Sequence, residues 1–423
     1  MNVTLQKTPA EAAFLDAAAA IDDPRRRQAL DKFIGMGLPH RRLEDWRWTD
    51  LRQLIDGAYP PTPATRKAPA PEDWKRSPLL SHVRYRLVVI DGVYSAEASL
   101  LPADVSVEAI PSSSGPLESP VGGTDSDPIR VMNTAFLAGG VALRVQAGST
   151  LDLPIEIVSF TAAGERRTIA SRLTLDIGDG ASASFIETHI DEGGAHLTCA
   201  VTEARIGDGA RLDRIKLQLE NPEAIHLSNF EVAMGRDAIL RDCTLTAGGR
   251  VTRQQGFTSF EGEGSDARIL GAYLLRDRQH CDTRLVVDHR APACTSREIF
   301  KCVVADEARG VFQGKVIVQR GAQKTDGKQS SHGLLLSPMA EFDAKPELEI
   351  YADDVACGHG ATAGELDENM MFYLRSRGVP PAEAKALLVA AFAAEALGDI
   401  AHDGIRERLG GLVEDWVRGA EIG

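Results

Sequence analysis

Cys357 and His359 stand two residues apart, with Gly358 between them and Gly360 directly after them. If residues 355–359 form a strand, its period of two places both side chains on one face. A thiolate and an imidazole are ligands that suit iron, zinc or an iron–sulfur cluster. Two ligands do not complete a four-coordinate site, so a metal site here is predicted to be unfinished or shared. A buried cysteine beside a hydrogen-bonded histidine is the alternative.

Two glycine–lysine segments have the composition of phosphate-binding loops but not their spacing. Gly310–Lys315 has three residues between its glycines instead of four, and a valine follows the lysine. The segment 321–329 has five intervening residues and glutamine after the lysine. Neither pattern cradles a phosphate in the known way. We therefore predict that this chain binds no nucleotide and is not an enzyme, and that any ATP dependence comes from a separate subunit.

Composition narrows the function classes further. The 47 basic and 61 acidic residues give a net charge of −14, which disfavours nonspecific binding to nucleic acid or to an anionic membrane. The sequence has no run of 18 apolar residues and no signal segment at its start, so we expect a cytoplasmic protein. Six cysteines without a C-x-x-C pair argue against a disulfide framework. Apart from Cys357, the cysteines are expected to be packing residues: 199, 243, 281, 294 and 302.

A repeat of short strands fills the middle of the chain. The segment Ile177–Ala181 (Ile-Gly-Asp-Gly-Ala) returns at 206–210, and glycines 178, 207, 235 and 264 are spaced 29, 28 and 29 residues apart. Such a period is typical of a solenoid. The segments alternate and carry β-branched residues, which favours stacked strands over helical repeats. A β-sandwich with accidental Gly-Asp turns remains the alternative fold.

A β-helix by itself is also compatible with a carbohydrate-active enzyme acting alone. Such an enzyme needs carboxylates that converge on one face of the solenoid. The pair Asp353 and Asp354 would point to opposite faces if both lay on one strand. This enzyme class is therefore kept only as the alternative function.

Both ends of the chain are predicted to be helical. Thr8, Pro9 and Glu11 form a helix start signal, and three helices are expected at about 365–376, 381–398 and 402–418. Residues 111–128, rich in Ser, Gly, Pro and Asp, resemble a mobile loop. We predict three units: an N-terminal helical domain and linker (1–80), a β-helix core (81–364) and a C-terminal helical domain (365–423).

The segment Lys345–Thr362 closely resembles the SufB/SufD family of iron–sulfur cluster assembly proteins. The match continues at Phe372–Gly378, at Gly310–Lys315 and in the segment 44–49 (Glu-Asp-Trp-Arg-Trp-Thr). The form of the Cys357 motif and the modest length are typical of the family's SufD members rather than the longer SufB. One departure is His332, where many relatives have asparagine.

The resemblance implies a mainly β fold: a right-handed parallel β-helix core between helical ends. It implies a scaffold in the SUF system that pairs with a SufB-like paralogue and binds the SufC ATPase, supporting de novo cluster formation and iron acquisition. Metal ligation of a nascent cluster shared with SufB is expected at His359 and Cys357, with His359 preferred as the ligand and assembly or metal handling as the alternative role of Cys357. A homodimer in the absence of SufB, and a reduced flavin on the complex, are left open. SufC contacts are expected on the C-terminal helices, at Phe372, Tyr373, Leu374, Leu387, Leu388 and Phe392.

Overall fold

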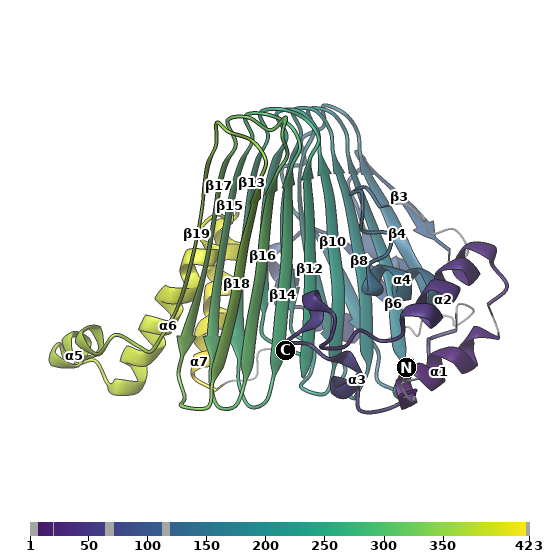
Figure 1. Ribbon diagram of the computed structural model, residues 1–423. Helices are drawn as coiled ribbons and strands as arrows, with labels where there is room; N and C mark the ends of the chain where they lie inside the picture. The colour runs from purple at the N-terminus through teal and green to yellow at the C-terminus, as the bar shows by residue number, and fades with distance from the viewer. Residues whose placement is uncertain (1–6, 20, 64–71, 112–118, 420–423) are drawn as a thin grey trace.

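The computed structural model describes residues 7–19, 21–63, 72–111 and 119–419, and its core is a stack of β-strands flanked by helices (Figure 1). The strands form two sheets. The ten-stranded sheet contains β1 (Tyr85–Ile90), β2 (Val93–Leu100), β5 (Ile155–Thr161), β7 (Ser182–Asp191), β9 (Arg211–Gln218), β11 (Ile239–Thr246), β13 (Asp266–Leu275), β15 (Thr295–Val304), β17 (Asp326–Leu335) and β19 (Ala356–Gly364). The nine-stranded sheet contains β3 (Val105–Ile110), β4 (Leu137–Val145), β6 (Thr168–Ile177), β8 (Leu197–Ile206), β10 (Ile225–Met234), β12 (Val251–Phe260), β14 (His280–His289), β16 (Arg309–Val318) and β18 (Glu341–Ile350).

From β4 onwards, successive strands alternate between the two sheets, and each pairs in parallel with the strand two places later. One turn of the solenoid is therefore two strands. The sequence repeat is this turn, because Ile177 of β6 lies beside Ile206 of β8 in the sheet register. The predicted parallel β-helix is confirmed. The β-sandwich alternative is wrong, because from β4 onwards neighbours within each sheet are parallel and come from consecutive turns.

The repeated glycines lie at the corners between strands, where the turns stack closely. A Cβ added to Gly207 would lie 2.4 Å from Asp179 Oδ1, and one added to Gly235 would lie 2.6 Å from Asp208 Oδ1. Any side chain at these two positions would clash with the turn below. The glycine period in the sequence therefore arises from the close stacking of the corners.

The space between the two sheets, here called the lumen, holds the largest apolar cluster. Alternate residues of each strand point into it, such as Ala204 and Ile206 of β8 and Val232 and Met234 of β10. Cys281, Cys294 and Cys302 also pack there, as expected for structural cysteines. Cys199 and Cys243 are equally buried, but they lie on the outer faces beneath helices.

Helices from the N-terminal and C-terminal parts of the chain cover the outer faces of the two sheets. The N-terminal region contains α1 (Pro9–Ala18), α2 (Pro24–Met36), α3 (Leu51–Leu54), α4 (Pro128–Phe136) and the short 3-10 helices η1 (Glu44–Trp46), η2 (Asp73–Arg76) and η3 (Leu80–His82). The predicted start of α1 is confirmed, since Thr8 and Glu11 form a reciprocal capping box. Helices α1, α2 and α4 pack on the nine-stranded sheet, where Phe14 stacks on Phe136 at 5.0 Å.

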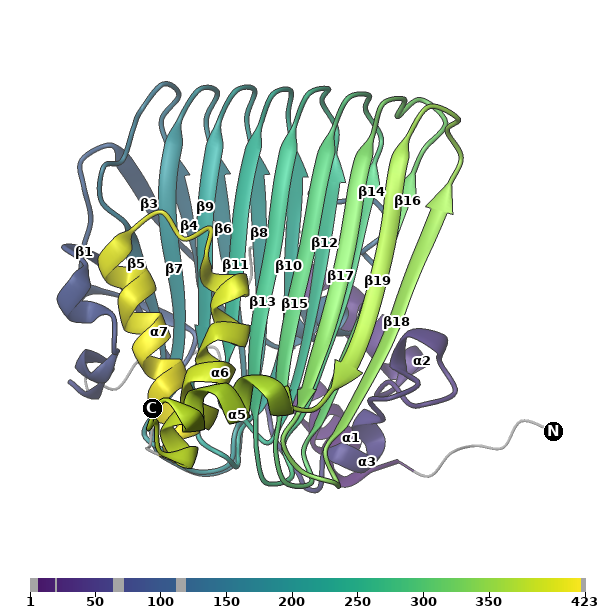
Figure 2. The ribbon, with the colours of Figure 1, turned by 90° about the vertical axis from the view of Figure 1, so that its left-hand side faces the viewer.

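The C-terminal helices are α5 (Glu368–Ser376), α6 (Pro381–Leu397) and α7 (Asp403–Val417), close to the predicted ranges. Helices α6 and α7 cover the outer face of the ten-stranded sheet (Figure 2), and α5 projects away from the strands (Figure 1). Val389 and Ala393 of α6 and Leu409 of α7 are fully buried in this packing. These helices thus pack on their own chain and still leave a face exposed.

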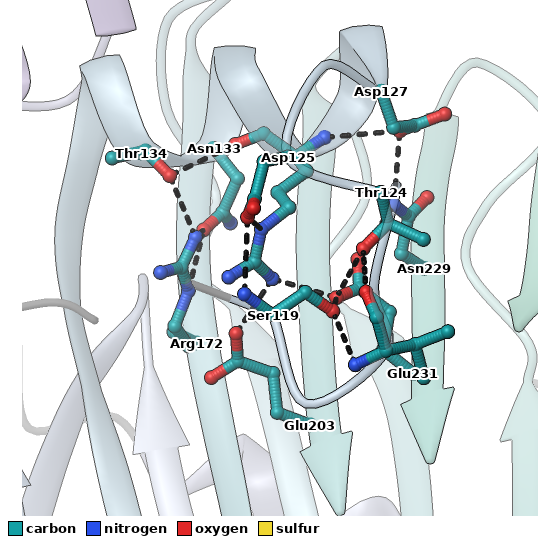
Figure 3. Close-up of polar contacts among 12 residues, drawn as sticks. Ser119, Thr124, Asp125, Asp127, Asn133, Thr134, Arg172, Glu203, Asn229 and Glu231 are labelled. Carbon is teal, nitrogen blue, oxygen red and sulfur yellow. Dashed lines mark hydrogen bonds and ion pairs between the residues drawn. The ribbon is translucent and has the colours of Figure 1, made fainter. Parts of the chain in front are cut away.

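A mobile loop was predicted at 111–128. Residues 112–118 lie outside the described residues, and the rest of the segment differs from the prediction. Residues 119–127 are tied to the nine-stranded sheet, and α4 begins at Pro128 with Asp127 as its N-cap (Figure 3). Arg130 of α4 binds Glu203 at 2.6 Å and Glu231 at 2.7 Å, and Ser119 donates to Glu231 as well. Glu203 and Glu231 hold the helix, and Glu231 also holds Ser119, so residues 119–127 are fixed to the sheet and differ from the predicted mobile loop.

Candidate functional site at the open end of the solenoid

Strands β18 and β19 end the two sheets, and each has one strand neighbour among the described residues. Figure 2 shows them side by side at the same end of the solenoid. The free edge of each carries backbone N–H and C=O groups that can pair with another strand. Beside them, Met339, Ile350 and Tyr351 are exposed by 68, 42 and 54%. This end, here called the open end, therefore offers both strand edges and apolar surface to a partner.

Cys357 and His359 both belong to β19, on the side that faces the lumen. Cys357 packs against the lumen cluster, and a Cβ added to its register neighbour Gly327 would lie 3.5 Å from Cys357 Sγ. His359 is exposed and lies beside Gln329 in the register. The predicted shared face follows, because the two residues are separated by one strand position.

The lead-in to this motif is not one continuous strand. β18 ends at Ile350, residues 351–355 form the corner, and β19 begins at Ala356 in the other sheet. Asp353 and Asp354 therefore lie in a turn rather than on opposite faces of a strand. The corner brings the thiol and the imidazole to the mouth of the lumen.

Behind His359, the lumen is polar. Gln329 of β17 lies beside His359, and Glu298 of β15 lies beside Gln329. Among the described residues, neither the carboxyl oxygens of Glu298 nor the amide of Gln329 has a hydrogen-bond partner. Sequence reasoning missed both residues, although alternation along β15 places Glu298 on the same face as the buried Phe300.

Burial favours the protonated forms of the Glu298 carboxyl and the Cys357 thiol. It raises the pKa of Glu298 to about 7, although Ser296 and Arg297 offset part of the shift. The Ser296 hydroxyl is itself hydrogen bonded to His289 Nε2 at 3.0 Å. Burial also raises the pKa of the Cys357 thiol, with smaller contributions from Asp326 and Glu298. The thiol is therefore mostly protonated at neutral pH and would have to lose its proton to bind a metal.

The protein ligands at the open end are few. In the part of the chain that the structure describes, no three His, Cys, Asp or Glu side chains are grouped so as to hold a metal ion. Cys357 and His359 thus supply at most two ligands. A tetrahedral iron or cluster site here would need at least two further ligands.

The residues predicted to bind a partner divide into two groups. Phe372 and Tyr373 of α5 and Leu387 of α6 are exposed by 74, 53 and 46%. Leu374, Leu388 and Phe392 are partly buried. Phe392 packs inwards, with its ring 4.9 Å from Lys301 Nζ, and is therefore part of the seat of α6 on the sheet.

The glycines of the lysine-containing segment 310–315 serve packing in β16. A Cβ on Gly310 would lie 2.3 Å from Cys302 Sγ, and one on Gly314 would lie 2.2 Å from the Gln329 amide. The absence of side chains at these two positions lets residues of the opposite sheet cross the lumen. This packing accounts for the glycine spacing without a phosphate.

The N-terminal cluster at 44–49 reaches the open end. Trp46 packs on Arg253 at 4.5 Å, and Asp45 binds Arg284 at 3.0 Å. Glu44 binds Lys345 of the edge strand β18 at 2.8 Å. The segment that resembles the family's opening motif therefore braces the nine-stranded sheet close to its free edge.

Comparison with known proteins adds the family context. Residues 160–392 match the family described as SUF system FeS cluster assembly, SufBD core domain. The chain is 32% identical over 390 residues to the iron-sulfur cluster assembly protein SufD of Escherichia coli K12, covering 91% of each chain. It is 28% identical to a SufBD family protein of Synechocystis, covering 91% of this chain and 89% of that one. It is 24% identical to SufD of Bacillus subtilis, covering 70% of this chain and 68% of that one.

Proposed function

Since this chain belongs to the SufB/SufD family, as a SufD-type member with a role in SUF iron–sulfur cluster assembly, we propose that it is a non-catalytic scaffold. In this proposal its open end pairs with a SufB-like paralogue, and its C-terminal helices bind a SufC-type ATPase. The nascent cluster is the cargo of the assembly and is held between the two scaffold chains. The observation that carries the proposal is the pair Cys357 and His359 on an edge strand with one neighbour.

The open end supports the pairing. At the closed end β2 and β3 turn back antiparallel, whereas β18 and β19 continue the parallel ladders and keep edges beside exposed Ile350 and Tyr351. A paralogue that adds its own edge strands would satisfy the backbone groups and bury the apolar side chains. A second copy of this chain could use the same edges when the paralogue is absent, as the resemblance predicts.

The ligand proposal follows from the same geometry. His359 is exposed and needs no rearrangement to reach a metal from outside, so it is proposed as the ligand. Cys357 is partly buried and mostly protonated, which favours a role in assembly or metal handling. A site with too few ligands in one chain suits a cluster that must be passed on, because a fully enclosed cluster could not leave.

The ATPase contact is proposed on α5 and the exposed face of α6. Phe372, Tyr373 and Leu387 present apolar surface that nothing in the described chain covers. Aromatic and leucine side chains on adjoining helices form the kind of patch that docks a protein partner. The partly buried Leu374, Leu388 and Phe392 support the helices from below.

Anaerobic co-expression of the three chains tests this assignment. The tagged chain is expected to recover the paralogue and the ATPase together. Joint replacement Phe372→Ala and Leu387→Ala should remove the ATPase while the paralogue stays bound. Leu153→Ala, at another exposed leucine, is the matched control and should retain both partners. Recovery of neither partner with the wild-type chain would contradict the proposed function, and a flavin in the recovered complex would be visible in its absorbance spectrum.

The carbohydrate-active alternative receives no support from the site. Glu187, Asp242 and Glu298 point into the lumen and are buried, so they are not available to a polysaccharide. An assay for polysaccharide turnover by the isolated chain is expected to be negative.

A further inference from the structure

A row of three side chains crosses the outer face of the ten-stranded sheet at the open end. Lys301 of β15 lies beside His332 of β17 in the register, and His332 lies beside Thr362 of β19. His332 Nδ1 and Thr362 Oγ1 are hydrogen bonded at 2.7 Å. The row ends on the strand that carries His359, three positions away and therefore on the opposite face.

The other end of the row is held by α6. The Lys301 side chain is only 5% exposed, and its ammonium group forms an ion pair with Glu395. The ring of Phe392, one turn earlier on α6, packs over the same ammonium group at 4.9 Å. The seat of α6 on the sheet and the outer face of β19 are thus connected through adjoining side chains.

Two features make this connection specific. β19 has one strand neighbour, so the side-chain bond to β17 adds to a single ladder of backbone hydrogen bonds. Burial and the neighbouring Lys301 lower the pKa of His332, while Glu395 opposes the shift, so the ring is mainly neutral at neutral pH. A neutral ring can keep its bond to the threonine hydroxyl beside a buried cation.

We propose that His332 is a positioning residue that, together with Lys301, couples the seating of α6 to the position of β19 and hence of His359. This inference rests on the proposed function, because it assigns the route by which an ATPase bound to the C-terminal helices reaches the cluster site. A shift of α6 would move Lys301, and the change would pass through His332 to Thr362. The route consists of side-chain contacts whose removal leaves the backbone ladder in place.

Hydrogen exchange of the β19 amides in the full-length chain within the complex tests the route. In the wild type, we expect binding of the ATPase subunit to change exchange across β19 several-fold. In His332→Ala, ATPase capture should be unchanged and the exchange response of β19 should be lost. Lys328→Ala, on the same strand and exposed, is the matched control and should keep the full response.

Conservative variants separate the coupling of α6 to β19 from a general loss of folding stability. His332→Asn places an amide atom where the ring nitrogen Nδ1 lies, so it should restore the response. Lys301→Met keeps the stem under Phe392 but removes the ion pair, and should lose the response as His332→Ala does. A response that persists in His332→Ala, or that is absent in a wild-type complex with its ATPase bound, would overturn the proposal. Failure of the wild type to capture the ATPase would instead contradict the proposed function.

Discussion

The two ends of the solenoid are built in opposite ways. At the N-terminal end, β2 and β3 turn back antiparallel on β1 and β4, and α1, α2 and α4 pack on the nine-stranded sheet nearby. At the C-terminal end, β18 and β19 continue the parallel ladders, and no antiparallel strand of the described residues follows them. A solenoid needs an end cap to remain soluble as a single chain. Among the described residues, antiparallel strands cap only the N-terminal end, which supports the proposal that a partner adds at the other end.

The lumen shows the same contrast in its charges. In the earlier turns, Arg214 bridges Glu187 at 2.6 Å and Asp242 at 2.7 Å, so buried ions are neutralised within the chain. Towards the open end, Glu298 and Gln329 have no hydrogen-bond partner among the described residues. The contrast between a carboxylate paired with arginine and one without a hydrogen-bond partner supports the proposal that assembly completes the surroundings of the open end.

Breaking the ion pairs of the earlier turns should have the largest effect on the folding free energy. Arg214→Met leaves Glu187 and Asp242 buried without their cation, which costs on the order of 3–5 kcal/mol of folding free energy. Chemical denaturation of the isolated chain would show this loss as a lower midpoint. The control Arg236→Met removes the exposed pair with Asp208 and should leave the midpoint nearly unchanged. An equal shift in both variants would contradict the assignment.

The unpaired carboxyl near the mouth should behave in the opposite way. Because the pKa of Glu298 is raised from 4.5 to about 7 on folding, the folded chain binds the proton more tightly and stability falls as pH rises through this range. Glu298→Gln should therefore stabilise the chain by about 2–3 kcal/mol above pH 7 and have little effect below pH 4.5. Denaturation midpoints at pH 4 and pH 8 measure the difference.

Glu187→Gln is the matched control in the same lumen. Burial alone would raise the pKa of Glu187, but Arg214, Lys216 and Thr202 bring it below its ordinary value. Ionised Glu187 thus contributes stability at high pH, and its amide variant should be destabilised there. Gains in stability from both amides would mean that the two regions of the lumen do not differ.

The exposed strand ends allow a direct comparison of the two termini of the solenoid. Ile350 ends β18 at the open end and Leu100 ends β2 at the closed end, with exposures of 42 and 47%. Ile350→Lys should weaken binding of the paralogue roughly tenfold, about 1.4 kcal/mol, because it puts a charge in the interface. Leu100→Lys should leave the titrated affinity unchanged. Equal losses would remove the distinction between the ends.

The smallest effect is expected from the N-terminal helices. Thr8→Ala removes the hydroxyl that accepts the Glu11 N–H at 3.2 Å, which should cost about 1 kcal/mol locally. Faster amide exchange in α1 would report this loss. Paralogue and ATPase capture should stay at wild-type levels, and a drop in either would show that the helical end is coupled to the open end.

The solenoid was predictable from the sequence because its corners require glycine and its strands alternate between apolar and polar residues. Gly207 and Gly235 are required by the close stacking of turns, and this requirement is visible as a period. Helix α4 was not predicted, although Asp127 and Pro128 are a helix start. The contacts that fix this helix join Arg130 to Glu203 and Glu231, which are distant in sequence and cannot be seen in a local pattern. Composition suggested a mobile loop because it could not report the buried carboxylates that fix residues 119–127 and α4.

The candidate site was only partly predictable. The shared face of Cys357 and His359 follows from alternation, but the corner at 351–355 that brings them to the lumen mouth does not. Glu298 carried a usable signal, since a charged residue on the buried face of a strand is uncommon. Its lack of a hydrogen-bond partner depends on which residues surround it in the lumen, and these come together only in the folded chain.

Iron and sulfide content of the anaerobically isolated complex tests the central claim most directly. The wild-type chain and His359→Ala would be compared, each recovered with its paralogue and ATPase in equal amounts. We predict that His359→Ala assembles normally and loses most of the iron and sulfide, because the proposed function makes the exposed imidazole at the open end a ligand of the nascent cluster. Wild-type iron and sulfide in a fully assembled His359→Ala complex would contradict that role.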